Sequence, residues 1–270
     1  MSAVRDDSEI EASRAPLLDH LIELRTRMLW AVVAFFACFL VCYVFAHDIY
    51  NFLAQPLYHA LEGQSNQRLI ATAPQETFVT YLTLSMWGGV FLSFPVLATQ
   101  IWLFVAPGLY KDERGAFFPY LIATPVLFTL GAALVLYVIM PLALNFLLSF
   151  QAPAGPGQLP IQLEAKVSEY FSLTMSLMFA FGLCFQLPVA LTLLGRVGIV
   201  TGAGLAKARR FAIFGVFVVA GLLTPPDALS QFALAVPVLA LYEISIWLVR
   251  ASEKKRAQPD AAASAAAPKS

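Results

Sequence analysis

The sequence predicts an all-α integral membrane protein with six transmembrane helices, both termini in the cytoplasm and a concave scaffold. Three observations predict this fold. Only 13% of the 270 residues are charged and the mean hydropathy is +0.74, whereas a soluble domain carries about 25% charged residues. Long uncharged runs follow one another along the chain, and lysine and arginine are concentrated in alternate connections. The net charge of zero offers no argument for nucleic-acid binding.

Uncharged runs mark the candidate spans. They extend over residues 28–46, 77–110, 115–163, 170–195, 211–226 and 228–242. A helix needs about 20 residues to cross the hydrocarbon core, so the first and fourth runs fit one crossing each. The second and third are longer and must continue outside the core. The fifth is strongly apolar only over 211–223, which allows either a re-entrant hairpin or a short span that thins the bilayer.

The distribution of basic residues decides between these two interpretations. With six crossings, 15 of the 17 lysines and arginines fall on the side that holds both termini. Only Arg68 and Lys166 fall on the other side, in the connections 47–76 and 151–168. Cytoplasmic loops carry the excess of basic residues, so both termini are cytoplasmic. The sequence therefore predicts six crossings, with short fifth and sixth helices.

The predicted spans lie in one domain between two polar ends. We expect a flexible cytoplasmic N-terminus over 1–16, a six-helix transmembrane domain over 17–250 and a disordered cytoplasmic tail over 251–270. Several prolines fall within or near the spans. We interpret them as kinks that curve the scaffold, and hinges are the alternative.

Two polar residues in the apolar parts of the chain are functional candidates. Glu243 directly follows the last uncharged run and is itself followed by apolar residues, and Gln186 lies within the fourth run. An ionisable group inside a membrane is a functional candidate, although Glu243 could be shallow because Arg250 follows two turns later. Asp227 and Gln231 share one helix face, and Asp227 also suits a helix-capping position. The sequence contains no nucleotide-binding loop, nucleophile elbow or metal-ligand pair, so it does not support an enzyme, a cofactor or a metal.

Charged residues near the cytoplasmic ends of the spans form the second group of candidates. Glu23 lies on the polar face of an amphipathic stretch, residues 17–27, directly before the first run. Glu113 follows the second run between Lys111 and Arg114. Simple ion pairs, with Arg27 for Glu23, are the alternative interpretation, and such surface pairs contribute only about 0–1 kcal/mol.

With these residues the sequence resembles the TatC family, the polytopic signal-peptide receptor subunit of the twin-arginine, Sec-independent protein translocase. The resemblance spans residues 17–250 and rests on five stretches. They are His20-Leu-Ile-Glu23-Leu-Arg25, Pro56-Leu57, Phe104-x-Ala-Pro107-x-Leu-Tyr110-x-x-Glu113-Arg114, Phe181-Gly-x-x-Phe-Gln186-x-Pro188-Val189 and Leu223-Thr-Pro-Pro-Asp227-x-x-Ser230-Gln231.

The resemblance implies roles for these residues. Glu23 and Glu113 match acidic positions that contact the arginine pair of the signal peptide, and Leu24, Arg25 and Phe104 complete the implied binding site. Gln186 stands where many members of the family have glutamate, which leaves it a hydrogen-bonding role. Three further positions match a region of partner-subunit contact: Asp227, Gln231 and Pro56.

The resemblance also implies partners and a location. The partners are twin-arginine signal peptides of folded precursors, TatB-like and TatA-like single-span subunits, the lipid bilayer and further copies of the chain in a homo-oligomer. The implied location is the bacterial inner membrane, and transport is driven by the proton-motive force. Two other functions stay open: a small-solute transporter that uses Glu243 and Gln186, and a structural anchor without arginine dependence.

Overall fold

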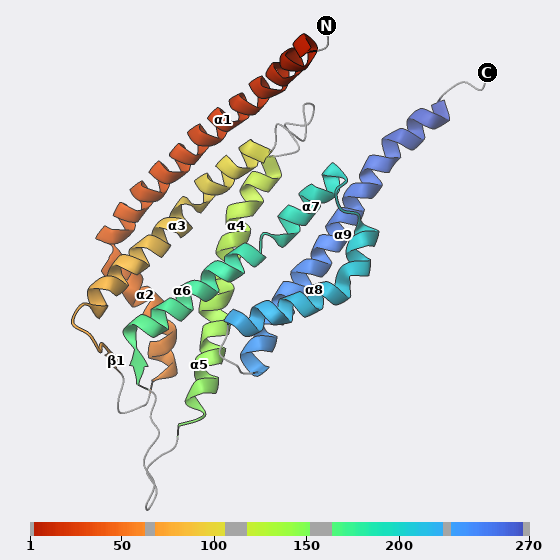
Figure 1. Ribbon diagram of the computed structural model, residues 1–270. Coiled ribbons are helices and arrows are strands. Elements are labelled where there is room, and N and C mark those ends of the chain that lie inside the picture. The colour runs from red at the N-terminus through yellow and green to blue at the C-terminus, as the bar shows by residue number, and fades with distance from the viewer. Residues whose placement is uncertain (1–2, 63–67, 106–117, 152–163, 224–227, 267–270) are drawn as a thin grey trace, which may run out of the picture. The chain divides into compact units, whose positions relative to one another are not determined.

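The computed structural model describes residues 3–62, 68–105, 118–151, 164–223 and 228–266, which are almost entirely helical (Figure 1). In chain order the elements are α1 (Ala3–Val44), α2 (Ala46–Ala60), β1 (Leu69–Ile70), α3 (Glu76–Val105), α4 (Phe118–Leu134), η3 (Val135–Ile139), α5 (Met140–Leu148), β2 (Ala165–Lys166), α6 (Val167–Cys184), α7 (Leu187–Val197), α8 (Gly202–Leu223) and α9 (Ala228–Ala266). The predicted all-α class is confirmed.

Among the described residues, five helical segments are long and apolar enough to cross a membrane. They are Leu21–Val44, Glu76–Ile101, Pro119–Leu148, Val167–Arg196 and Gln231–Lys254. They correspond to the first four runs and the last run of the sequence. The remaining run lies in α8, whose first half carries Lys207, Arg209 and Arg210. The longest uncharged stretch of α8 is residues 211–223, so its apolar part is short, as predicted.

Both terminal segments continue the neighbouring helices. α1 begins at Ala3, and α9 extends over 39 residues to Ala266. Residues 3–16 and 251–266 are therefore helical, and the flexibility of these ends stays a prediction. Their alanine, glutamate, lysine and arginine residues are among the best helix formers.

The internal contacts divide the chain into two compact units. The first consists of Met1–Ala46 with Leu82–Pro125. Within it, α1 and α3 approach closely at Gly89, where an added Cβ would lie 2.9 Å from Cα of Phe39. Only glycine allows this approach, because any side chain would collide with the backbone of α1. This contact fixes α1 against α3 within the first unit.

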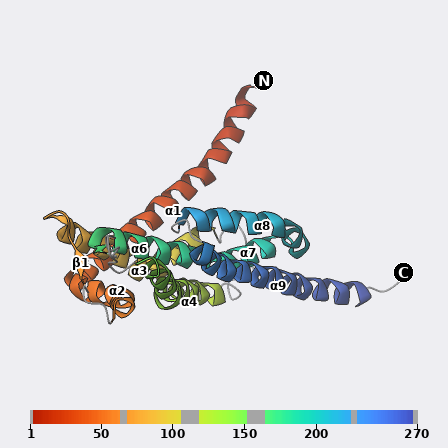
Figure 2. The ribbon, with the colours of Figure 1, turned by 90° about the horizontal axis from the view of Figure 1, so that it is seen from below.

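The second unit consists of His47–Tyr81 with Val126–Ser270. Here α7 and α8 both pack along α9 (Figures 1 and 2). Leu205, Ile246 and Val249 form the buried cluster between α8 and α9. α4 crosses α6 at Gly131, where an added Cβ would lie 2.7 Å from the carbonyl oxygen of Phe181.

The third span changes its helical geometry before it ends. The π-helical turn η3 separates α4 from α5, and the N–H of Met140 donates to the carbonyl of Val135, five residues earlier. Pro141 follows directly and has no N–H to continue the ladder. π-Helical turns of this kind occur frequently at functional sites.

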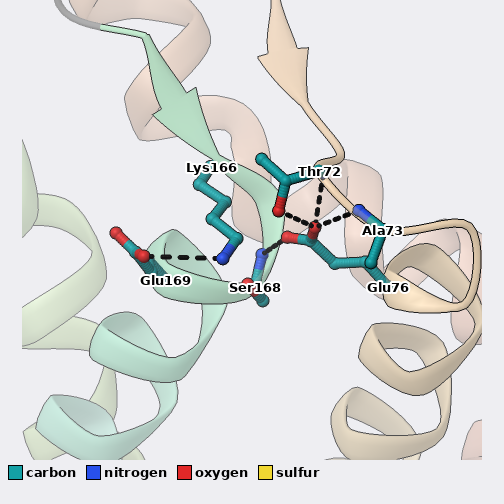
Figure 3. A network of polar contacts seen from close by, with 6 residues as sticks. All are labelled: Thr72, Ala73, Glu76, Lys166, Ser168 and Glu169. Atoms are coloured by element: carbon teal, nitrogen blue, oxygen red, sulfur yellow. Dashed lines mark hydrogen bonds and ion pairs between the residues drawn. The ribbon is translucent and has the colours of Figure 1, made fainter.

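The two outer connections of the second unit are joined. β1 and β2 pair in parallel, with Leu69 opposite Ala165. Glu76, which is only 8% exposed, accepts hydrogen bonds from both connections (Figure 3). Its Oε2 accepts from the N–H of Thr72 at 2.7 Å and of Ala73 at 3.3 Å, and its Oε1 accepts from the N–H of Ser168 at 3.0 Å. One carboxylate thus connects the start of α3 to the start of α6.

Candidate functional site

Glu23 lies in α1, two residues after the start of the apolar segment Leu21–Val44. Its side chain is 37% exposed and forms an ion pair with Arg27, one turn later. Arg27 donates from Nε at 3.1 Å and also from Nη2, and both bonds reach Oε1 of Glu23. The carboxylate is therefore accessible and already bound by a guanidinium group, and the predicted Glu23–Arg27 pair is present.

The neighbours of Glu23 combine apolar and basic character. Leu24 is 38% exposed, and Leu21, Ile22 and Met28 are more exposed than Leu24. Arg25 is exposed as well. A ligand at Glu23 would meet both an acid for a cation and an apolar surface for an adjoining hydrophobic segment.

Of the other two predicted residues of this site, the structure describes only the backbone of Phe104 and does not describe Glu113. Phe104 lies in the last turn of α3, and its side chain is outside the described structure. Glu113 falls within 106–117 and lies outside the described residues. The joint action of Glu23 and Glu113 therefore stays a prediction.

Gln186 lies at the junction between α6 and α7. Its side-chain Nε2 donates to the backbone carbonyl of Gly182 at 3.4 Å. The backbone carbonyl of Gln186 accepts from the N–H of Ala190 at 2.9 Å. Pro188 occupies the first turn of α7, where a missing N–H costs no intrahelical bond. In this structure Gln186 helps to connect two helices that share one span.

Glu243 is held by a basic residue rather than isolated in the membrane. Arg209 of α8 donates from Nε and Nη2 to its two carboxylate oxygens, each at 2.7 Å. This fork-to-fork geometry is the strong form of an ion pair. Hydrogen bonding to Glu243 raises the pKa of Arg209 above its ordinary value, and the negative charge of Glu243 adds to that effect. Because the carboxylate of Glu243 is paired with Arg209, this arrangement argues against a solute transporter that uses Glu243.

The residues predicted to contact partner subunits have different positions. Gln231 lies in the first turn of α9, and its Nε2 donates to the carbonyl of Phe217 in α8 at 3.0 Å. Pro56 is buried within α2. Asp227 lies outside the described residues. Gln231 and Pro56 belong to the second unit, whereas Glu23 belongs to the first.

Three polar residues that connect different helices or connections through hydrogen bonds were not singled out from the sequence. They are Arg209, Glu76 and Glu253, whose Oε1 accepts from the N–H of Gly202 at the start of α8 at 2.8 Å. Glu76 precedes a long apolar run, which is a recognisable signal for a helix start. The partners of Arg209 and Glu253 are 34 and 51 residues away along the chain, so local sequence gives no signal for them.

Comparisons with known proteins agree on one family. Residues 19–237 match the family model of the Sec-independent protein translocase protein TatC. The Sec-independent protein translocase protein TatC of Magnetococcus marinus is 45% identical over 92% of this chain and 89% of its own length. That of Escherichia coli K12 is 40% identical over 87% of this chain and 88% of its own length.

A solved structure has the same fold. The crystal structure of the twin-arginine translocase receptor TatC superposes with a TM-score of 0.74 at 34% sequence identity. The match covers 87% of this chain and 99% of that one. Together with the five apolar segments and α8, this likeness confirms the predicted membrane fold.

Proposed function

Because this chain belongs to the TatC family of Sec-independent protein translocase proteins, we propose that it binds the twin-arginine signal peptides of folded precursors. It is a multi-pass protein of the bacterial inner membrane and a transport subunit rather than an enzyme. The observation that supports the binding proposal best is Glu23, an accessible carboxylate that already binds a guanidinium group among exposed apolar side chains.

The chemistry of the arginine pair suits two carboxylates. A guanidinium group has a planar fork of donors that matches a carboxylate, and lysine lacks this fork. Glu23 binds one arginine of the peptide and Glu113 binds the other. Leu24 and Phe104 contact the apolar segment that follows the pair, and Arg25 lies in the same turn as Glu23.

After the peptide has docked, partner subunits are recruited. We assign this contact to Asp227, Gln231 and Pro56, with TatB-like and TatA-like single-span subunits as the partners. The hydrogen bond from Gln231 to Phe217 supports the assignment, because it holds the start of α9 against α8, the helix whose apolar part is short. Transport is then driven by the proton-motive force, and the chain acts as a homo-oligomer within the larger complex.

The proposal is tested by the affinity of a twin-arginine signal peptide for the full-length chain in lipid nanodiscs. Glu23→Gln and Glu113→Gln each remove a hydrogen-bonded charge, which is worth about 1.5–3 kcal/mol, so each should weaken binding by about tenfold or more. Glu62→Gln is the matched control, because Glu62 is an exposed acid in the outer connection.

A peptide with two lysines in place of the arginines separates this function from the alternatives. A receptor should bind the lysine peptide more weakly by a similar factor, whereas a structural anchor should bind both peptides equally. A photo-crosslinker at Leu24 should capture only the arginine peptide. Unchanged affinity in the Glu23→Gln, Glu113→Gln double variant would refute the proposal.

A further inference from the structure

A pocket of about 340 Å³ lies in the second unit between α2 and the η3–α5 part of the third span. Its lining includes Phe52, Gln55 and His59 of α2, and Tyr137 and Asn145 of the third span. The peptide-binding proposal does not use this pocket. Both helices that line it are interrupted by a proline, and this shared feature determines its chemistry.

The two prolines leave backbone carbonyls without their usual donors. Pro56 in α2 has no N–H for the carbonyl of Phe52, four residues earlier. Pro141 likewise has no N–H for the carbonyls of Leu136 and Tyr137, because Met140 already donates to Val135. Both prolines line the pocket together with Phe52, Leu136 and Tyr137. The residues that carry these backbone acceptors, from two helices, therefore line the same pocket.

Side-chain amides add further acceptors to the pocket. Gln55 and Asn145 carry amides, and among the described residues neither amide has a hydrogen-bond partner within the protein. The lining contains neither lysine nor arginine. An acid, Glu62, lies beside the lining residue His59, with its Oε2 3.5 Å from Nδ1 of His59. A group with several N–H donors and a positive charge matches this set, whereas an anion does not.

The pocket lies near the outer surface of the membrane. α2 directly follows the first span, whose start is cytoplasmic, and Asn145 lies one turn from the end of the third span at Leu148. Phe52 and Tyr137 are exposed aromatic residues beside the pocket. Aromatic side chains in such positions favour the headgroup level of a bilayer, and a ring face also attracts a cation.

We propose that this pocket binds the primary ammonium group of a phosphatidylethanolamine headgroup from the outer leaflet. An ammonium group has three N–H donors and no acceptor, which complements two proline-freed backbone segments and two amides. A choline headgroup carries the same charge without a donor, so it cannot make these bonds. The site is independent of twin-arginine peptide binding at Glu23.

Native mass spectrometry of the full-length chain tests the proposal with phosphatidylethanolamine, its N-methylated forms and phosphatidylcholine of identical acyl chains. We expect phosphatidylethanolamine to bind about tenfold more tightly than phosphatidylcholine, since hydrogen bonds to a charged group are lost in the latter. Affinity should fall stepwise as N–H donors are methylated. Equal binding of the two lipids, or tighter binding of an anionic lipid, would overturn the proposal.

Two variants test the acceptors themselves. Asn145→Leu removes one amide, and Pro141→Ala supplies the missing N–H so that a freed carbonyl can be satisfied within the helix. Each should reduce the preference for phosphatidylethanolamine about tenfold, while Gln75→Leu, an exposed residue outside the lining, leaves it unchanged. If Pro141→Ala does not fold, Asn145→Leu combined with Gln55→Leu decides. A preference that survives this pair of changes would refute the site.

Discussion

Arg27 donates from both Nε and Nη2 to the same carboxylate oxygen of Glu23, one helical turn before it in α1. The pair has the acid on the N-terminal side, the favourable orientation at this spacing. Both side chains are partly exposed, so an incoming guanidinium group can replace that of Arg27 at little cost. The resting ion pair thus resembles the contact that we propose for the signal peptide.

This relationship leads to a first prediction. Arg27→Ala removes the internal competitor for Glu23, so we expect the affinity for a twin-arginine peptide to stay equal or rise by about two- to fivefold, the factor for a surface pair worth up to about 1 kcal/mol. Peptide titration of the nanodisc-embedded chain measures it. Arg68→Ala, at an outer pair with Glu164, is the control. A tenfold loss in Arg27→Ala would mean that Arg27 holds Glu23 in place.

The crossing of α4 and α6 provides a second prediction, on stability. An alanine at Gly131 would place Cβ 2.7 Å from the carbonyl oxygen of Phe181, and this backbone atom cannot move aside easily. Gly131→Ala should therefore lower the free energy of unfolding by about 1–3 kcal/mol, as expected for overpacking.

Gly215→Ala is the matched control for this crossing. Nothing lies within 4 Å of the Cβ that it would add in α8. It should be neutral or stabilise α8 by about 0.5–1 kcal/mol through its higher helix propensity. Unfolding in mixed detergent micelles measures both variants. An equal effect of the two substitutions would contradict the close crossing.

Glu76 leads to a third prediction. Glu76→Ala would leave the N–H groups of Thr72, Ala73 and Ser168 without their buried acceptor (Figure 3). Unsatisfied buried donors are costly, so thermal unfolding should occur at a clearly lower temperature and protease should cleave the outer connections faster. Glu76→Gln keeps one acceptor oxygen and should lie between the wild type and Glu76→Ala.

Glu169→Gln serves as the control for the network around Glu76. Glu169 also lies at the start of α6, but its side chain is 78% exposed. The substitution would remove only its contact with Nζ of Lys166 at 3.7 Å. We expect its unfolding temperature to match that of the wild type. A shift as large as that of Glu76→Ala would assign the effect to charge near the helix start rather than to the lost acceptor.

The sequence predicted the features that depend on local residue patterns and on the orientation of the chain in the membrane. Hydrophobic runs located the spans, and the basic residues Lys207, Arg209 and Arg210 explain why the apolar part of α8 is short. The Glu23–Arg27 pair followed from spacing within one helix. The Arg209–Glu243 pair could not be predicted in this way, because its two residues lie in different helices. Which sides of these helices face each other depends on how α8 packs on α9.

The pairing of Arg209 with Glu243 gives the last prediction. If the two residues act as one unit, Glu243→Gln and Arg209→Gln should each lower the unfolding temperature, and the double variant should lose less than the sum of the two. The effect should shrink at high salt, because both side chains are about half exposed. Twin-arginine peptide affinity should not change in any of the three. Additive losses would show that the two side chains contribute independently, and solute flux that depends on Glu243 would instead favour a transporter.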